Sequence, residues 1–226
     1  MEKVTRKEAD SVLANRFVFY LTLHALICAA LLLGRTTLNH YFGFRFLTWN
    51  LFLAWLPLLF VCMAAFAEQK NIKILVYPLL ALWLLFLPNS FYIITDLIHL
   101  KHRSPVPLWY DVILLFSFAL NGCLVGMYSL LETQKLTQRL HRRNVNGFIM
   151  LSLFILVGFG IYLGRFSRWN SWDLFNRPED LFHDIVIRVV HPFQYAWTWV
   201  FTLITGVSLW VFYQMLRTLK LRSNSD

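Results

Sequence analysis

The sequence predicts an all-α integral membrane protein, a bundle of about six transmembrane helices that forms one domain over residues 1–226. Two observations carry this prediction. Hydrophobic residues make up 58% of the chain and charged residues only 15%, whereas a soluble domain has roughly 25% charged residues. The apolar residues also occur in runs of about 17–24, the length that crosses a hydrocarbon core of about 30 Å.

Six apolar runs are long enough to span the membrane, and each is read as one helix. They cover residues 17–34, 47–67, 72–98, 108–131, 147–164 and 195–216. The first run lacks a small-residue cleavage site, which favours a retained helix over a cleaved signal peptide. Between the last two runs, residues 177–190 place their apolar side chains on one stripe, which predicts an amphipathic helix lying in the membrane interface.

The formal net charge of +9 comes from Lys and Arg that stand singly or in pairs at the ends of the apolar runs. This distribution is typical of juxtamembrane charge and not of a nucleic-acid binding face, so no nucleic-acid partner is expected. Lys and Arg are more frequent in both terminal segments and in the second–third and fourth–fifth connections than in the other flanks. The bias predicts that both termini lie in the cytoplasm.

The end of the third run carries polar residues that a lipid-facing helix would avoid. In "FLPNSFYIITDLIHL" (residues 86–100), Pro88 predicts a kink because it cannot donate a backbone hydrogen bond. If the helix resumes, Asn89, Tyr92, Asp96 and His99 fall on one stripe. Such a stripe is expected to face the bundle interior or a water-filled vestibule.

Two further motifs are expected on the same, extracytoplasmic side. Asp111 opens the fourth run in "PLWYD", and Arg165 and Arg168 follow the fifth run in "GRFSRWNSWD". Deeper in the bundle, an amide at Asn121 is expected to bond another helix or to line a cavity. Small residues spaced four apart predict close helix packing, and they are Gly122, Gly126, Gly160 and Gly164.

These motifs define a candidate site. Asp96 and Asp111 would act as general bases or metal ligands, and His99 as a proton carrier or ligand. The cofactor is left open; a divalent metal, if one binds, would take these same three residues. The residues expected to bind substrate, with the two arginines holding an anionic group such as a lipid phosphate, are Asn89, Tyr92, Arg165, Arg168, Trp169, Asn170 and Asp173.

The three motifs, in this order, resemble a family of bacterial multi-pass membrane proteins known only as a domain of unknown function. The resemblance covers roughly residues 50–210 and implies membership and topology, with the bacterial cytoplasmic (inner) membrane as location, but no activity. The matching positions are Pro88, Asn89, Tyr92, Thr95, Asp96, His99, Trp109, Tyr110, Asp111, Arg165, Arg168, Trp169, Asn170, Trp172 and Asp173.

The sequence leaves several classes of function open. One is a membrane-embedded enzyme with an extracytoplasmic polar site that acts on a lipid-linked or anionic substrate, such as an anionic lipid. The alternatives are a small-solute transporter, favoured by the interrupted third run, and a structural or assembly subunit of a membrane complex, in which the polar residues only cap helices and pair with each other. The lipid bilayer is the expected partner, and oligomers are compatible with the sequence.

Overall fold

The structure, a computed structural model, describes residues 2–38, 44–100, 106–142 and 145–223, and side chains within residues 14–37, 44–100, 106–142 and 145–218. Within these ranges all regular structure is helical and no strand occurs. The elements in chain order are α1 (Glu2–Leu38), α2 (Phe46–Gln69), α3 (Lys73–Tyr92), the 3₁₀ helix η1 (Ile93–His99), α4 (Leu108–His141), α5 (Gly147–Arg165), α6 (Asp173–Asn176), α7 (Pro178–Val190) and α8 (Ala196–Ser223).

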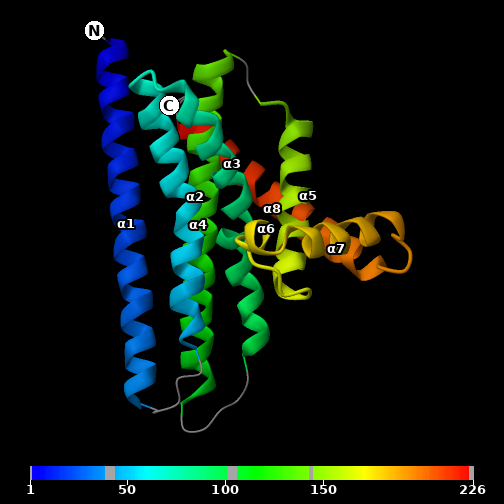
Figure 1. The fold of residues 1–226 in the computed structure, drawn as a ribbon. Helices are drawn as coiled ribbons and strands as arrows, with labels where there is room; N and C mark the ends of the chain where they lie inside the picture. The colour runs from blue at the N-terminus through cyan, green and yellow to red at the C-terminus, as the bar shows by residue number, and fades with distance from the viewer. Residues whose placement is uncertain (1, 39–43, 101–105, 143–144, 224–226) are drawn as a thin grey trace.

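Six helical stretches in the described part of the chain are long and apolar enough to cross a membrane. They confirm the predicted all-α bundle, and the chain is a multi-pass membrane protein. The bounds are Ala14–Thr37, Phe46–Gln69, Lys73–His99, Leu108–His141, Gly147–Arg165 and Ala196–Thr218. The start of α1 and the end of α8 lie at the same end of the bundle (Figure 1).

The fourth span is longer than predicted, because α4 continues past residue 131 to His141. After residue 131 the sequence turns polar, but Leu136 and Leu140 keep a spacing of four residues and so stay on one helix face. Leu136 is fully buried in the main core cluster, and Leu140 packs against that cluster. A helix can therefore outlast its apolar run when one face still packs on the protein.

The third span changes helix type at a different place from the predicted kink. The α-helix α3 runs through Pro88 to Tyr92, and the 3₁₀ helix η1 begins at Ile93. In a 3₁₀ helix, side chains three residues apart eclipse one another. The change therefore aligns Asp96 with His99 more closely than the α-helical spacing assumed from the sequence.

Glycines bring α3 close to the helices on either side of it, as the small-residue spacing predicted. A Cβ added to Gly122 of α4 would lie 2.6 Å from the carbonyl oxygen of Ser90, and one added to Gly160 of α5 would lie 2.7 Å from Cγ of Pro88. Both distances are shorter than ordinary van der Waals contact. The end of α3 is thus held tightly between α4 and α5.

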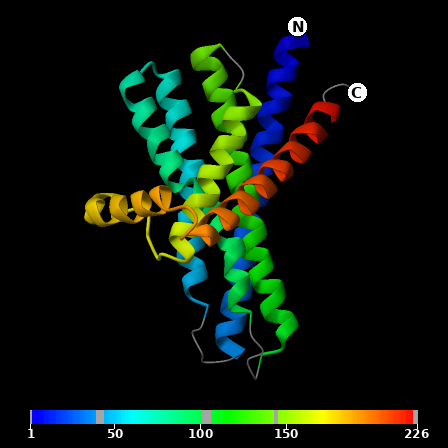
Figure 2. The same cartoon turned by 90° about the vertical axis from the view of Figure 1, so that its right-hand side faces the viewer.

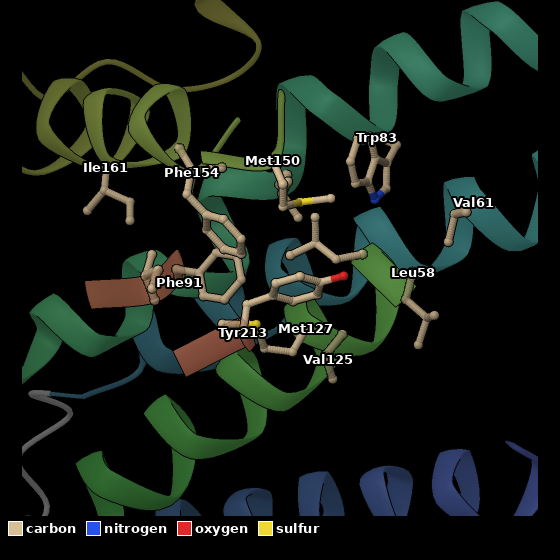
Figure 3. Close-up of a cluster of buried hydrophobic side chains, with 14 of the residues drawn as sticks. Leu58, Val61, Trp83, Phe91, Val125, Met127, Met150, Phe154, Ile161 and Tyr213 are labelled. Carbon is tan, nitrogen blue, oxygen red and sulfur yellow. The ribbon is translucent and has the colours of Figure 1, made fainter. Parts of the chain in front are cut away.

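Two apolar clusters fill the interior. The larger one joins α1, α2, α3, α4, α5 and α8 and lies mainly toward the end that carries the termini. Figure 3 shows its centre, where the ring of Phe154 lies between those of Phe91 and Tyr213, with centroids 6.4 and 5.5 Å away. The smaller cluster joins α1, α2, η1 and α4 at the opposite end.

Helix α7 runs across the bundle, whereas the spanning helices run along it, and α1, α2, η1 and α4 extend past it on the side away from the termini (Figures 1 and 2). Its bounds, Pro178–Val190, agree with the amphipathic helix predicted at 177–190. Phe182, Val186 and Val189 are 60%, 51% and 55% exposed. An apolar face left uncovered on a helix of this kind is typical of contact with a membrane interface.

Candidate functional site

Arg165, at the end of α5, is the centre of a polar cluster at the end of the third span. Its guanidinium forms an ion pair with Asp96 and donates from Nε to Thr95 Oγ1 at 2.7 Å. Nη1 lies 3.2 Å from Nε2 of His99, and the guanidinium carbon lies 4.2 Å above the ring of Tyr92. The Asp96–Arg165 pair therefore ties η1 to α5, as the motifs suggested.

Asp96 is fully buried and has a second partner on another helix. Asn50 of α2 donates from Nδ2 to Oδ2 of Asp96 at 2.8 Å, while Oδ1 is held by Arg165. A buried carboxylate needs a counter-charge and hydrogen bonds on its remaining lone pairs. Both oxygens of Asp96 are thus engaged, and three helical elements meet at this one side chain.

Asp111, the third predicted catalytic residue, belongs to a separate ion pair. Arg35 at the end of α1 donates from Nε to Oδ1 of Asp111 at 2.6 Å and from Nη2 to Oδ2 at 3.1 Å. Both side chains are 1% exposed, and the Arg35 guanidinium also lies 4.4 Å from the centre of the Phe44 ring. This two-pronged pair locks α1 to the start of α4.

The structure thus divides the predicted set in two: Asp96 and His99 contact Arg165, and Asp111 contacts Arg35. In the part of the chain that the structure describes, no three His, Cys, Asp or Glu side chains gather as a metal site requires. A functional role for the three residues stays a prediction. Among the described residues, no group of side chains could serve as ligands for the divalent metal.

A cavity of about 170 Å³ lies beside the Arg165 cluster, between α2, α3, α5 and the segment that follows α5. Three amide side chains line it, from Asn50, Asn89 and Asn170. Its aromatic lining comes from Trp49, Tyr92, Trp169 and Trp172, and no charged residue is among the described residues that line it. Asn50 and Tyr92 belong both to the cavity and to the surroundings of Arg165.

Asn89 is fixed in the cavity wall by both hydrogens of its amide. Nδ2 donates to the carbonyl of Phe86 at 3.1 Å and to Oγ of Ser171 at 2.9 Å, and Ser171 in turn donates to the carbonyl of Leu85. The side chain therefore adds a hydrogen bond to the backbone carbonyl of Phe86, two residues before Pro88. It also pins the loop after α5 against α3.

The loop after α5 is shaped by its polar residues. Arg168 is exposed and has a positive φ of 60°, an uncommon conformation for a residue with a side chain. Asn170 donates from its backbone N–H to Oδ2 of Asp173 at 2.8 Å. Asp173, which is buried, thus closes the turn that starts α6 and does not reach the cavity lining.

Arg188 of α7 is a second, partly buried centre of hydrogen bonds, and the sequence did not single it out as a site residue. It donates to Asp184 Oδ1 at 2.9 Å, to Ser167 Oγ at 3.0 Å and to Thr198 Oγ1 at 3.1 Å. Trp169 donates from Nε1 to the other oxygen of Asp184 at 2.8 Å. These bonds fasten α7 to the cavity loop and to α8.

Replacing Asp184 by Asn is expected to lower the melting temperature at neutral pH, by an amount that shrinks in acid. Partial burial opposes ionisation of Asp184, but hydrogen bonds from Trp169 and Arg188 outweigh it and lower the pKa below 3.8. Such a group stabilises the fold above its unfolded pKa, and the stabilisation is lost as the pH falls through the lower folded value. The difference between wild type and variant should therefore shrink as the pH falls below 3.8. Thermal unfolding followed by tryptophan fluorescence between pH 3 and 7 measures it.

Asp180→Asn is the matched control, because Asp180 lies on the same helix, is exposed and forms no hydrogen bond or ion pair with another described residue. Its melting temperature should stay close to that of the wild type, since a charge in the first turn of a helix contributes only about 0.3–1 kcal/mol. An equal gap for Asp184→Asn at all pH values would contradict the assigned role of its charge.

Asn121, the deep amide, is used for packing. Nδ2 donates to the carbonyl of Leu21 at 3.0 Å and lies 3.2 Å from His24, and Oδ1 accepts from Trp55 Nε1 at 3.0 Å. The side chain links α1, α2 and α4 and is fully buried. It therefore resembles a structural amide more than part of a polar path toward the termini.

Three groups of site residues were missed from the sequence. Arg35 looked like one of several charges at the end of a span, and nothing in its neighbours marked a buried partner. Trp49 and Asn50 stand at the start of an apolar run, and the polar asparagine in "LTWNLF" was the available signal. Arg188 was placed only on the polar face of an amphipathic helix.

The fold and the cavity together define a six-span membrane protein with a polar pocket between its helices. A family model described as "Protein of unknown function (DUF1361)" matches residues 49–212, so the chain belongs to this family. The match confirms the resemblance drawn from the three motifs. No curated protein and no solved structure matches the chain.

Proposed function

We propose that this protein binds the polar head group of a membrane lipid or lipid-linked molecule in the cavity beside Arg165. The observation that carries the proposal is the lining: amides and aromatic rings around about 170 Å³ of space, between helices that are otherwise apolar. Ligand pockets combine an apolar wall with a few placed polar groups in this way. A head group entering from the bilayer meets such a pocket without crossing the packed core.

The cavity is assigned to the extracytoplasmic side of a bacterial inner membrane, with both termini in the cytoplasm. The placement of the first and last helix ends at one end of the bundle supports this assignment (Figure 1), as does the excess of Lys and Arg in the flanks at that end. The residues of the cavity come from the opposite ends of their helices, namely the start of α2 and the ends of α3 and α5.

The second candidate is an enzyme that acts on the bound head group. It is favoured by one observation: Asp96 and His99 share Arg165, and Asn50 connects Asp96 to the cavity. For Asp96 to accept a proton from a substrate, it would have to release Arg165 or Asn50, because each holds one of its oxygens. Binding needs no such rearrangement and is therefore placed first.

Replacing Tyr92 by Phe is expected to reduce lipid retention by roughly three- to tenfold, the effect of one hydrogen bond. The phenyl ring of the variant would still lie against Arg165, so the melting temperature should hardly change. The measurement is native mass spectrometry of protein purified with its own membrane lipids, with the retained species counted.

Tyr77→Phe is the matched control, since Tyr77 lies on the same helix, is 58% exposed and does not line the cavity. The proposal would be wrong if the retained lipid had the same composition as the bulk membrane and if wild type and Tyr92→Phe retained equal amounts of it.

A further inference from the structure

The charge distribution around the cavity restricts what it can hold. None of the described residues in its lining is charged, and the nearby carboxylate of Asp96 and guanidinium of Arg165 pair with each other. A phosphate or carboxylate entering here would lose its hydration without gaining a counter-charge, which is strongly unfavourable. Arg168, exposed and without a contact among the described residues, does not line the cavity.

A cationic head group is also disfavoured, although aromatic rings often surround quaternary ammonium groups. Two of the four aromatic rings in the lining already have a guanidinium on one face. Arg165 lies 4.2 Å from the centre of the Tyr92 ring, and Arg177 lies 4.9 Å from that of Trp169. Those two ring faces are therefore already occupied, and a quaternary ammonium group, which has no N–H to donate, would leave the amide oxygens without a partner.

The amide oxygens that line the cavity can accept hydrogen bonds from hydroxyl groups of a ligand. The Oδ1 atoms of Asn50 and Asn89 accept no hydrogen bond from any residue that the structure describes, while their Nδ2 groups are fixed by Asp96 and by Phe86 and Ser171. A hydroxyl both donates and accepts, so neighbouring hydroxyls can pair with amide oxygens and with each other. Fixed acceptors of this kind select a ligand that carries several O–H groups.

The aromatic lining fits the other surface of such a ligand. Trp49 and Trp172 meet edge to face, with ring centres 6.0 Å apart, at one side of the cavity. The faces of aromatic rings carry partial negative charge, and the C–H bonds of a sugar ring point their partially positive hydrogens at such faces. The volume of about 170 Å³ is below the roughly 300–1,000 Å³ typical of drug-sized ligands, so it has room for a single ring.

We propose that the cavity binds the uncharged sugar ring of a glycolipid or other lipid-linked sugar. The inference rests on the proposed function and narrows it from any polar head group to a neutral hexose carried by a lipid. The amides bind the hydroxyls, the indoles cover the C–H face, and the lipid chain leaves the cavity between the helices.

The test uses the full protein in phosphatidylcholine nanodiscs that contain monoglucosyldiacylglycerol, phosphatidylglycerol or no added lipid, all with the same acyl chains. Native mass spectrometry is expected to show about tenfold more retained glucosyl lipid than phosphatidylglycerol. Asn170→Ala and Trp172→Ala should each reduce this retention about tenfold, and their melting temperatures establish that they are folded. Trp197→Ala on α8, where Trp197 is 79% exposed and outside the lining, should leave it unchanged.

Each other outcome separates this inference from the proposed function. Preferential retention of phosphatidylglycerol that falls in Arg168→Gln would overturn the sugar assignment and keep lipid binding. Preference for phosphatidylcholine over both would do the same. Release of the glucosyl lipid by an equal concentration of free glucose would point to a soluble sugar and overturn the lipid-borne one. Retention of none of the lipids above background would overturn both proposals.

Discussion

Replacing Asp111 by Asn is expected to lower the melting temperature by roughly 6–20 °C. The change removes the carboxylate charge of Asp111 from the guanidinium of Arg35, which is 1% exposed. Breaking a buried ion pair from one side costs about 3–5 kcal/mol, and one kcal/mol corresponds to about 2–4 °C in a chain of this size. Thermal unfolding of the protein in detergent, followed by tryptophan fluorescence, measures the shift.

The double variant Arg35→Met, Asp111→Leu should recover most of this loss, because two apolar side chains remove both buried charges together. Arg139→Gln is a control for the loss of an exposed pair: Arg139 lies 3.6 Å from Glu68, and the two side chains are 46% and 25% exposed. Such surface pairs contribute about 0–1 kcal/mol. If Asp111→Asn shifted the melting temperature no more than Arg139→Gln does, the pair would not be the lock between α1 and α4.

The sequence predicted the membrane spans well because span length and apolar composition are set by the bilayer and need no tertiary information. It also brought Asp96 and Arg165 together, since both stood at the same end of neighbouring helices and had opposite charge. The partner of Asp111 was out of reach of such reasoning. In the sequence, Arg35 looked like one of the positive charges that set topology at the end of a span. Only the packing of α1 against α4 reveals that it is buried.

The cavity depended on features that no local pattern encodes. The 3₁₀ helix that begins at Ile93 contacts α2 and α4, and an α-helical stripe could not predict it. Trp49 and Asn50 come from a helix far along the chain from the loop at Asn170, and only the tertiary fold brings them to one space. Of the predicted binding residues, Asn89, Tyr92, Trp169 and Asn170 line that space, whereas Arg165, Arg168 and Asp173 do not.

Replacing Arg165 by Gln is expected to lower the melting temperature by a similar amount, roughly 6–20 °C. The change removes the charge that balances Asp96, which is 1% exposed, and the bond to Thr95 that holds η1. Arg165 does not line the cavity, so the retention of lipid by the folded fraction should stay the same. Thermal unfolding and native mass spectrometry of one preparation measure both quantities.

Arg168→Gln is the matched control, because Arg168 lies three residues after Arg165 but is exposed and forms no hydrogen bond or ion pair with another described residue. It should leave the melting temperature within about 2 °C of wild type, as surface substitutions do. Adding Asp96→Asn to Arg165→Gln should restore part of the lost stability, because the double variant no longer buries an unpaired charge. If the double variant were instead as unstable as the sum of the two single variants, Asp96 and Arg165 would act independently. The ion pair would then not be what joins the third span to the fifth.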